Sequence, residues 1–304
     1  MIDLIKTLTE LYGPSGYEQA IRQAIQAEIT PHVDEVTVDA LGNLHALKKG
    51  TDSSHTIMLA AHMDEIGLMV TKIEKEGFAR FTNLGGLQPL NLAGSRVIFN
   101  NGVIGTINVE DSLYRPNIKA GLANLFIDFG VSKREDVPVQ VGDVAAFYGP
   151  CIEVNNRIMS KSLDDRIGCV VQIETLKQVQ TPPHDIHFVF TVQEEVGVRG
   201  ATAGAFRVDP TIAIAIDVTP SGDTPGDKPF TVSLGQGAAI KIMDRGSLSH
   251  PAIKDWMIDT AEANDIAYQL EVLTAGGTDA RAMQLAKAGS AAGCVSIPCR
   301  HVHA

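Results

Sequence analysis

Predicted helices and strands alternate along most of this chain, and a long segment without helices interrupts them. Apolar residues at helical spacing predict helices over residues 4–11, 16–29, 166–178, 253–264 and 279–288. Short apolar runs rich in β-branched residues predict strands over residues 36–39, 44–47, 56–61, 187–192, 212–216, 267–273 and 293–297. This alternation indicates an α/β fold with a mixed, mostly parallel sheet that is flanked by helices.

The interruption covers residues 68–159. Six β-like runs, at 68–73, 79–82, 96–99, 103–109, 125–129 and 144–147, are separated there by Gly, Asn and Pro turns. No helix of normal length is predicted in this segment. We therefore expect residues 1–67 and 160–304 to form one discontinuous α/β domain, and residues 68–159 to form an inserted β-rich domain that resembles a small barrel.

Composition excludes several classes of protein. The net charge of -11 argues against a nucleic-acid partner, which would require basic patches. No window of about 18 continuous apolar residues is present, so no membrane span is expected. Four cysteines in 304 residues, without C-x-x-C spacing, are too few for a disulfide framework. Together with an N-terminus that lacks signal-peptide features, they favour a cytoplasmic enzyme.

Two adjacent glutamates, Glu194 and Glu195, follow the apolar run 187–192. Two carboxylates at the end of a buried strand repel each other and lose hydration, which is tolerable if one binds a cation and the other acts beside it. Neighbouring residues on an extended chain point in opposite directions. The pair is therefore a candidate metal ligand and general base.

Other His and Asp residues also follow predicted strands or begin a predicted helix, where sites of open α/β sheets gather. They are His62, Asp64, Asp164, Asp165, Asp217, His301 and His303. Each has a simpler interpretation: His62 as an ordinary core or surface histidine, Asp164 and Asp165 as helix caps, and His303 as part of the tail. Asp64 lies two residues from His62 and could orient its imidazole. Five such places within one α/β frame argue jointly for a site.

Six motifs resemble those of the M42 family of metallo-aminopeptidases. They are Ala61-His-Met-Asp-Glu-Ile-Gly67, Lys161-Ser-Leu-Asp-Asp-Arg-Ile-Gly168, Gln193-Glu-Glu-Val-Gly-Val-Arg-Gly-Ala201, Ala215-Ile-Asp-Val218, Gly276-Gly-Thr-Asp-Ala280 and Pro298-Cys-Arg-His-Val-His303. The resemblance implies removal of N-terminal residues from peptide substrates with the help of two divalent metal ions, zinc or cobalt. It also implies that residues 1–67 and 160–304 carry the catalytic site. The inserted domain would form dimers that assemble into a tetrahedral dodecamer.

The same resemblance implies a role for each candidate residue. Asp164 would bridge two metals, with His62 and Asp217 at one and Glu195 and His303 at the other. Glu194 would be the general base, and Asp64 would orient His62. His301 stands where the family usually has an aromatic residue, and the motif alignment favours His303 as the ligand. The chain stops at Ala304, where relatives continue, so the second metal site is expected to be weak or empty.

The sequence also indicates a substrate preference and leaves alternative functions open. The stretch from Asp217 to Asp227 resembles glutamyl aminopeptidases, which favours an acidic N-terminal residue. The residues 276–280 are expected to line the specificity pocket, although a glycine turn before a helix would explain them as well. One alternative is a carboxylate glycosidase, which would need no metal. Another is a catalytically impaired peptide-binding homologue. The sequence contains no G-x-S-x-G motif, which argues against a serine hydrolase.

Overall fold

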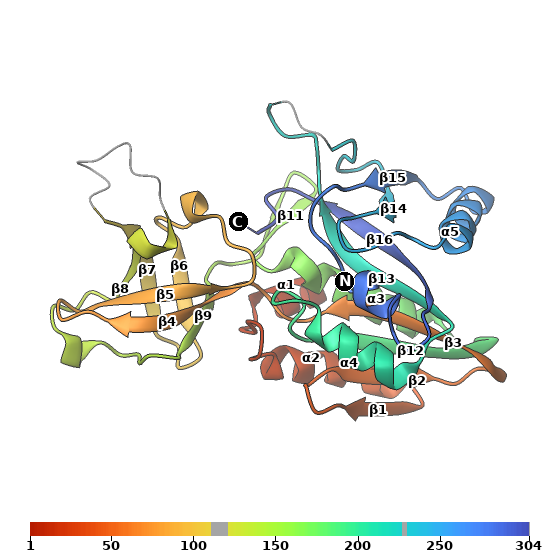
Figure 1. Cartoon of the computed structure of the whole chain (residues 1–304), viewed down its shortest axis with the longest axis horizontal. Helices are drawn as coiled ribbons and strands as arrows, with labels where there is room; N and C mark the ends of the chain where they lie inside the picture. The colour runs from red at the N-terminus through yellow and green to blue at the C-terminus, as the bar shows by residue number, and fades with distance from the viewer. Residues whose placement is uncertain (111–120, 227–229, 304) are drawn as a thin grey trace.

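A computed structural model describes residues 1–110, 121–226 and 230–303 of the chain. It has two parts, an eight-stranded sheet with helices and a barrel set to one side of it (Figure 1). The chain builds the first strands of the sheet, passes through the barrel, and returns to complete the sheet. The division of the chain at residues 67 and 160 stays a prediction.

The sheet is mixed, with a parallel centre. Its strand order is β1 (Glu35–Val38), β2 (Leu44–Lys48), β12 (His184–Thr191), β3 (Asp52–His62), β13 (Ile212–Pro220), β16 (Ala291–Cys299), β14 (Ala238–Met243) and β15 (Tyr268–Val272). The four central strands, β12, β3, β13 and β16, run parallel. On either side of them, β2 and β14 run antiparallel to their central neighbours. The predicted mixed, mostly parallel sheet is thereby confirmed.

Helices cover both faces of this sheet. On one face α1 (Ile2–Glu10), α2 (Gln19–Ile29) and α3 (Leu163–Gln178) pack over a core that includes Phe188 and Phe190. On the other face, α4 (Arg199–Val208) and α6 (Ala280–Met283) enclose a second core around Val189. Val189 lies between the two phenylalanines in β12, and successive side chains of a strand point to opposite faces. A further helix, α5 (Pro251–Ala263), packs against β14 and β16.

The barrel closes through six strands and has an apolar core of its own. The order is β4 (Gly67–Ile73), β5 (Phe78–Leu84), β8 (Leu125–Asp128), β7 (Ile104–Val109), β6 (Arg96–Phe99) and β9 (Val144–Phe147). Leu68, Val97 and Ile127 are fully or almost fully buried within it. Closure leaves no unpaired sheet edge, so a small β-module can be stable beside the larger sheet. The predicted barrel-like insertion is confirmed.

Several elements differ from the sequence prediction. The structure adds α4, β14 and the hairpin of β10 (Ile152–Val154) and β11 (Arg157–Met159). Helix α4 contains two glycines and few large apolar residues, which weakens its helical signal. The helix predicted over 279–288 is only four residues long. Short 3-10 helices occur at Thr30–His32, Pro89–Asn91, Leu122–Asn124 and Arg134–Asp136. Within the described residues, no helix is both long and apolar enough to cross a membrane.

Candidate active site

The predicted site residues meet at the carboxyl edge of the central strands. His62 is the last residue of β3, and Glu194 and Glu195 follow the end of β12. Asp217 lies in β13 and is paired in register with Ser296 of β16. His303 follows β16, and Asp164 lies at the start of α3. Parallel strands place their carboxyl ends at one edge of a sheet, which explains why residues far apart in the sequence come together.

Asp164 lies between the two histidines. Its Oδ1 is 3.0 Å from Nε2 of His62, and its Oδ2 is 3.4 Å from Nε2 of His303. On the His62 side, Oδ1 of Asp217 is 4.0 Å from the same Nε2. On the His303 side, Oε2 of Glu195 is 3.4 Å from Nε2. Asp164 therefore lies between His62 and His303, and the donor groups whose atoms all lie within 4.8 Å of one another are His62–Asp164–Glu195 and His62–Asp165–Asp217.

Asp165 is an acidic residue that the predicted metal-ligand set omits. It is fully buried, and its carboxylate accepts hydrogen bonds from the backbone N–H groups of His62 (3.2 Å) and Gly168 (3.1 Å). Its oxygens also lie close enough to His62 and Asp217 to share a cation with them. Of the two aspartates, Asp165 therefore bonds an amide in the first turn of α3, as a helix cap does, while Asp164 faces the histidines.

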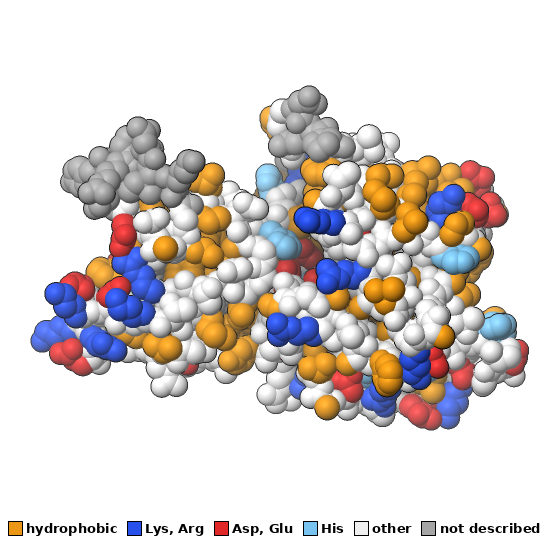
Figure 2. All heavy atoms as spheres, viewed as in Figure 1, with side chains coloured by type: hydrophobic (Ala, Val, Ile, Leu, Met, Phe, Trp, Pro, Cys, Tyr) orange, Lys and Arg blue, Asp and Glu red, His pale blue; other side chains and the backbone are white. Residues whose placement is uncertain are grey.

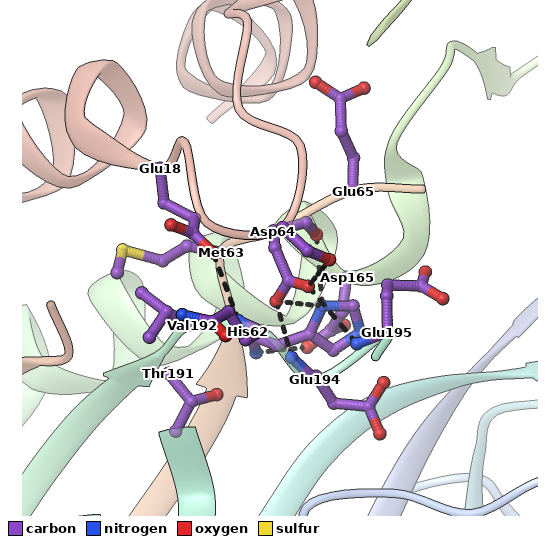
Figure 3. A network of polar contacts seen from close by, with 12 residues as sticks. Glu18, His62, Met63, Asp64, Glu65, Asp165, Thr191, Val192, Glu194 and Glu195 are labelled. Atoms are coloured by element: carbon purple, nitrogen blue, oxygen red, sulfur yellow. Dashed lines mark hydrogen bonds and ion pairs between the residues drawn. The ribbon is translucent and has the colours of Figure 1, made fainter. Parts of the chain in front are cut away.

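Asp64 holds both His62 and the acidic pair in place (Figure 3). Nδ1 of His62 is 3.1 Å from the backbone oxygen of Asp64 and 3.5 Å from its Oδ1. The same carboxylate accepts hydrogen bonds from the backbone N–H of Glu194 (2.9 Å) and of Glu195 (3.2 Å), and from Oγ of Ser15 (2.6 Å). A ring whose Nδ1 donates to Asp64 keeps the Nε2 lone pair free for a ligand.

The two glutamate side chains point apart, as Figure 3 shows. Oε2 of Glu195 faces His303, whereas the carboxylate of Glu194 forms no ion pair within the described residues. Both side chains are largely buried, and burial raises their pKa values well above the ordinary range. One carboxylate of the pair is therefore among the potential ligands, while the other is close to them and uncommitted.

The electrostatics of the cluster suit divalent cations. Burial, and after it the charge of Asp164, raises the pKa of Asp217 to about 8. Burial disfavours ionised Asp164 too, but hydrogen bonds from His303 and His62 hold its pKa well below its usual range. Within the described residues, no Lys or Arg forms an ion pair with Asp164, Asp217 or Glu195. Buried oxygen and imidazole donors without a fixed positive partner fit divalent metal binding.

A second buried network braces the loop that carries Asp164. The Glu65 carboxylate contacts Nζ of Lys161 at 2.8 Å and Nη2 of Arg166 at 3.1 Å. Arg166 has no exposed surface and also donates to the backbone oxygens of Met63 (3.1 Å) and Leu8 (2.7 Å). Local sequence patterns did not predict this network. The sequence feature that could have indicated it is the group of charged residues in the motifs at 61–67 and 161–168, next to the end of β3 and the start of α3.

Comparison with known proteins identifies the family. A sequence model of the family described as M42 glutamyl aminopeptidase matches residues 42–304. The chain belongs to the M42 family. A relative from Acetivibrio thermocellus is 46% identical over 100% of this chain and 92% of its own length. The lysyl aminopeptidase of Pyrococcus furiosus is 34% identical over 99% of this chain and 90% of its own length.

Solved structures agree with this assignment. An aminopeptidase of Desulfurococcus kamchatkensis superposes with a TM-score of 0.95 at 40% identity, over 100% of this chain and 88% of that one. The TET1 peptidase of Pyrococcus horikoshii is described as assembling into a tetrahedron or a large octahedral shell. It superposes with a TM-score of 0.88 at 34% identity, over 100% of this chain and 92% of that one. This M42 protein is therefore a hydrolase of the aminopeptidase type. Ala304, on which the expectation of a weak second site is based, lies outside the described residues.

Proposed function

We propose that this M42 protein removes N-terminal residues from peptides with two divalent metal ions, zinc or cobalt. The observation that carries this proposal is the position of Asp164, whose two oxygens face the Nε2 atoms of His62 and His303. A bridging carboxylate of this kind would hold both ions. His62 and Asp217 would complete one ligand set, and Glu195 and His303 the other.

Glu194 would transfer the proton, and Asp64 would hold the site residues in position. A bound metal pair polarises a carbonyl and lowers the pKa of the attacking water. Glu194 is the uncommitted carboxylate of the pair, so it would accept the proton of that water and deliver it to the leaving amine. Asp64 would fix the positions of the His62 ring and the Glu194 backbone relative to each other.

Aminoacyl p-nitroanilides test this proposal directly. We expect hydrolysis that disappears after chelation, returns when zinc or cobalt is added, and follows a measured content of two metals per chain. Turnover that survives complete chelation would refute the metal mechanism, and sugar hydrolysis that survives it would favour the glycosidase. A folded protein with neither metal nor turnover would instead support the impaired peptide-binding homologue.

We further propose a preference for acidic N-terminal residues. A cavity of about 500 Å³ adjoins Glu194 and Asp217, and three cationic side chains line it: Lys241, Arg245 and Arg281. Lys241 is buried and paired with Glu271, while within the described residues neither arginine has an ion-pair partner. Figure 2 shows Lys and Arg side chains around the hollow in which acidic side chains and a histidine are visible. The cavity is also lined by Asp164, Glu194, Glu195 and Asp217, so a substrate carboxylate would be attracted to its arginines once bound metal ions offset those acidic charges.

The same cavity includes Gly276, Gly277 and Thr278, as expected for a specificity pocket. Asp227, at the end of the stretch that resembles glutamyl aminopeptidases, lies outside the described residues. We expect Arg281→Ala to lower kcat/KM for a glutamyl substrate about tenfold, equivalent to about 1.4 kcal/mol, and to leave a leucyl substrate unchanged. Arg207→Ala, on the exposed end of α4, is the charge-matched control. An equal effect on both substrates would contradict the acidic preference.

Assembly and location complete the proposal. The shells described for the TET1 peptidase support a dimer-based tetrahedral dodecamer for this chain, formed through the barrel. Exposed apolar side chains on the barrel, including Leu90 and Ile104, are available for such contacts. Light scattering coupled to size exclusion would give the mass, and a monomer at micromolar concentration would contradict this assembly. A cytoplasmic location also stays a prediction.

A further inference from the structure

The barrel reaches into the candidate metal site through one turn. Gly85 and Gly86 directly follow β5, and their backbone lies against the side chains of Glu195 and His303. A Cβ atom placed on Gly86 would be 2.5 Å from Nδ1 of His303 and 2.9 Å from its Cε1. A Cβ atom on Gly85 would be 2.9 Å from Oε2 of Glu195. Real Cβ atoms essentially never approach this closely, so a side chain at either position would displace the site residue or the turn.

The two nitrogens of His303 face different parts of the molecule. Nε2 is 3.4 Å from both Asp164 and Glu195, on the side of the donor cluster. Nδ1 is the ring atom nearest to the Cβ position of Gly86. The backbone of Gly86 therefore lies directly against the Nδ1 edge of the ring.

The turn is held in place on both sides. The side-chain amide of Asn83 donates to the backbone oxygen of Gly85 at 2.6 Å. Leu87, the next residue after the turn, packs against the core of the barrel. Backbone that is fixed in this way restricts a neighbouring ring better than a mobile side chain would, because little conformational entropy is left to lose.

We propose that the Gly85–Gly86 turn of the barrel is a positioning element of the second metal site, which fixes the His303 ring so that Nε2 faces Asp164 and Glu195. It would restrict the His303 ring by packing against Nδ1, as Asp64 restricts the His62 ring by a hydrogen bond at Nδ1. The barrel then supplies part of the active site in addition to any role in assembly. This inference rests on the proposed function, because it assumes that His303 binds a metal.

Gly86→Ala tests the proposal, because Gly86 has a backbone conformation open to any residue and only the contact with His303 forbids a methyl group. Gly149→Ala is the matched control, since a Cβ there meets no atom within 4 Å. Metal-free protein would be titrated with Co²⁺ and followed by calorimetry and by the visible cobalt spectrum. We expect Gly86→Ala to weaken the second binding step about tenfold or more and to change the spectrum of the second ion. The first step and the control should match the wild type.

A double-mutant cycle with His303→Ala separates orientation from general damage. Without the imidazole, the methyl group of Gly86→Ala has free space, so its effect on the Tm of the metal-free protein should vanish in the His303→Ala background. Equal destabilisation in both backgrounds would overturn the proposal, as would unchanged cobalt binding by Gly86→Ala. If His303→Ala itself binds two ions with wild-type affinity, the proposed metal role of His303 fails. If His303→Ala loses one ion and Gly86→Ala loses none, only the turn is wrongly assigned.

Discussion

Replacement of Asp64 by Asn would test how the acidic turn is held. The Asp64 carboxylate has no exposed surface and accepts from the backbone N–H of Glu194 at 2.9 Å and of Glu195 at 3.2 Å. Ser15 donates to it at 2.6 Å. Asparagine retains one oxygen and replaces the other with an amide donor. Whichever way the amide turns, one backbone N–H of the turn then faces another donor.

The expected losses of stability and activity in Asp64→Asn follow from these contacts. A hydrogen bond to a charged group contributes about 1.5–3 kcal/mol, and a buried N–H without an acceptor costs about 1–3 kcal/mol. One bond is lost and the other becomes neutral, so we expect Asp64→Asn to lower the free energy of unfolding by about 3 kcal/mol. The turn carries both Glu194 and Glu195, so kcat should fall about 100-fold, or about 2.7 kcal/mol of activation free energy.

Asp39→Asn is the control for general destabilisation. The Asp39 carboxylate also accepts from three backbone N–H groups, those of Leu41, Gly42 and Asn43, each at 3.0 Å, but it belongs to the turn between β1 and β2. Urea unfolding, metal content and steady-state kinetics would be measured for both variants. Asp39→Asn should lose stability and keep its kcat. If Asp64→Asn unfolds within 0.5 kcal/mol of the wild type (about the ordinary scatter of surface substitutions) with normal turnover, the reasoning is refuted.

Three further predictions concern the base, the pH dependence and the core. Glu194→Gln should retain two metals and lose at least about 100-fold in kcat, and near-normal kcat would show that Glu194 is not the base. Burial, and after it the charge of Asp64, raises the pKa of Glu18 from 4.5 to about 7, so the folded state holds a proton that the unfolded state has lost between these values. The free energy of unfolding of the wild type should therefore fall relative to that of Glu18→Gln as pH rises from 4.5 to 7. A difference between the two free energies that stays constant across this pH range, measured by urea unfolding, would contradict this. In Gly200→Ala the new Cβ would lie 2.3 Å from the backbone oxygen of Val192, so Tm should drop by several degrees, whereas an unchanged Tm would disprove the close packing.

Local patterns in the sequence were sufficient for the fold class and for the general location of the site. Apolar runs at the right length identified most strands of the sheet, and the loss of helical periodicity identified the β-rich segment. They failed where a strand carries charge. Strand β14 contains Lys241, whose burial is offset by Glu271 in the neighbouring strand β15, a partner that no local pattern reveals.

The candidate residues could be named from sequence because strand ends are local features and parallel strands bring their ends together. Their division of labour was not local. Asp64 bonds to the backbone of Glu194 across 130 positions, and Gly86 contacts His303 from a different part of the fold. Whether Asp164 or Asp165 faces the histidines also depends on how α3 begins. The sequence therefore determined which chemistry is available, and tertiary structure decided which atom each group faces, because hydrogen bonds and like-charge repulsion act over a few ångströms in space.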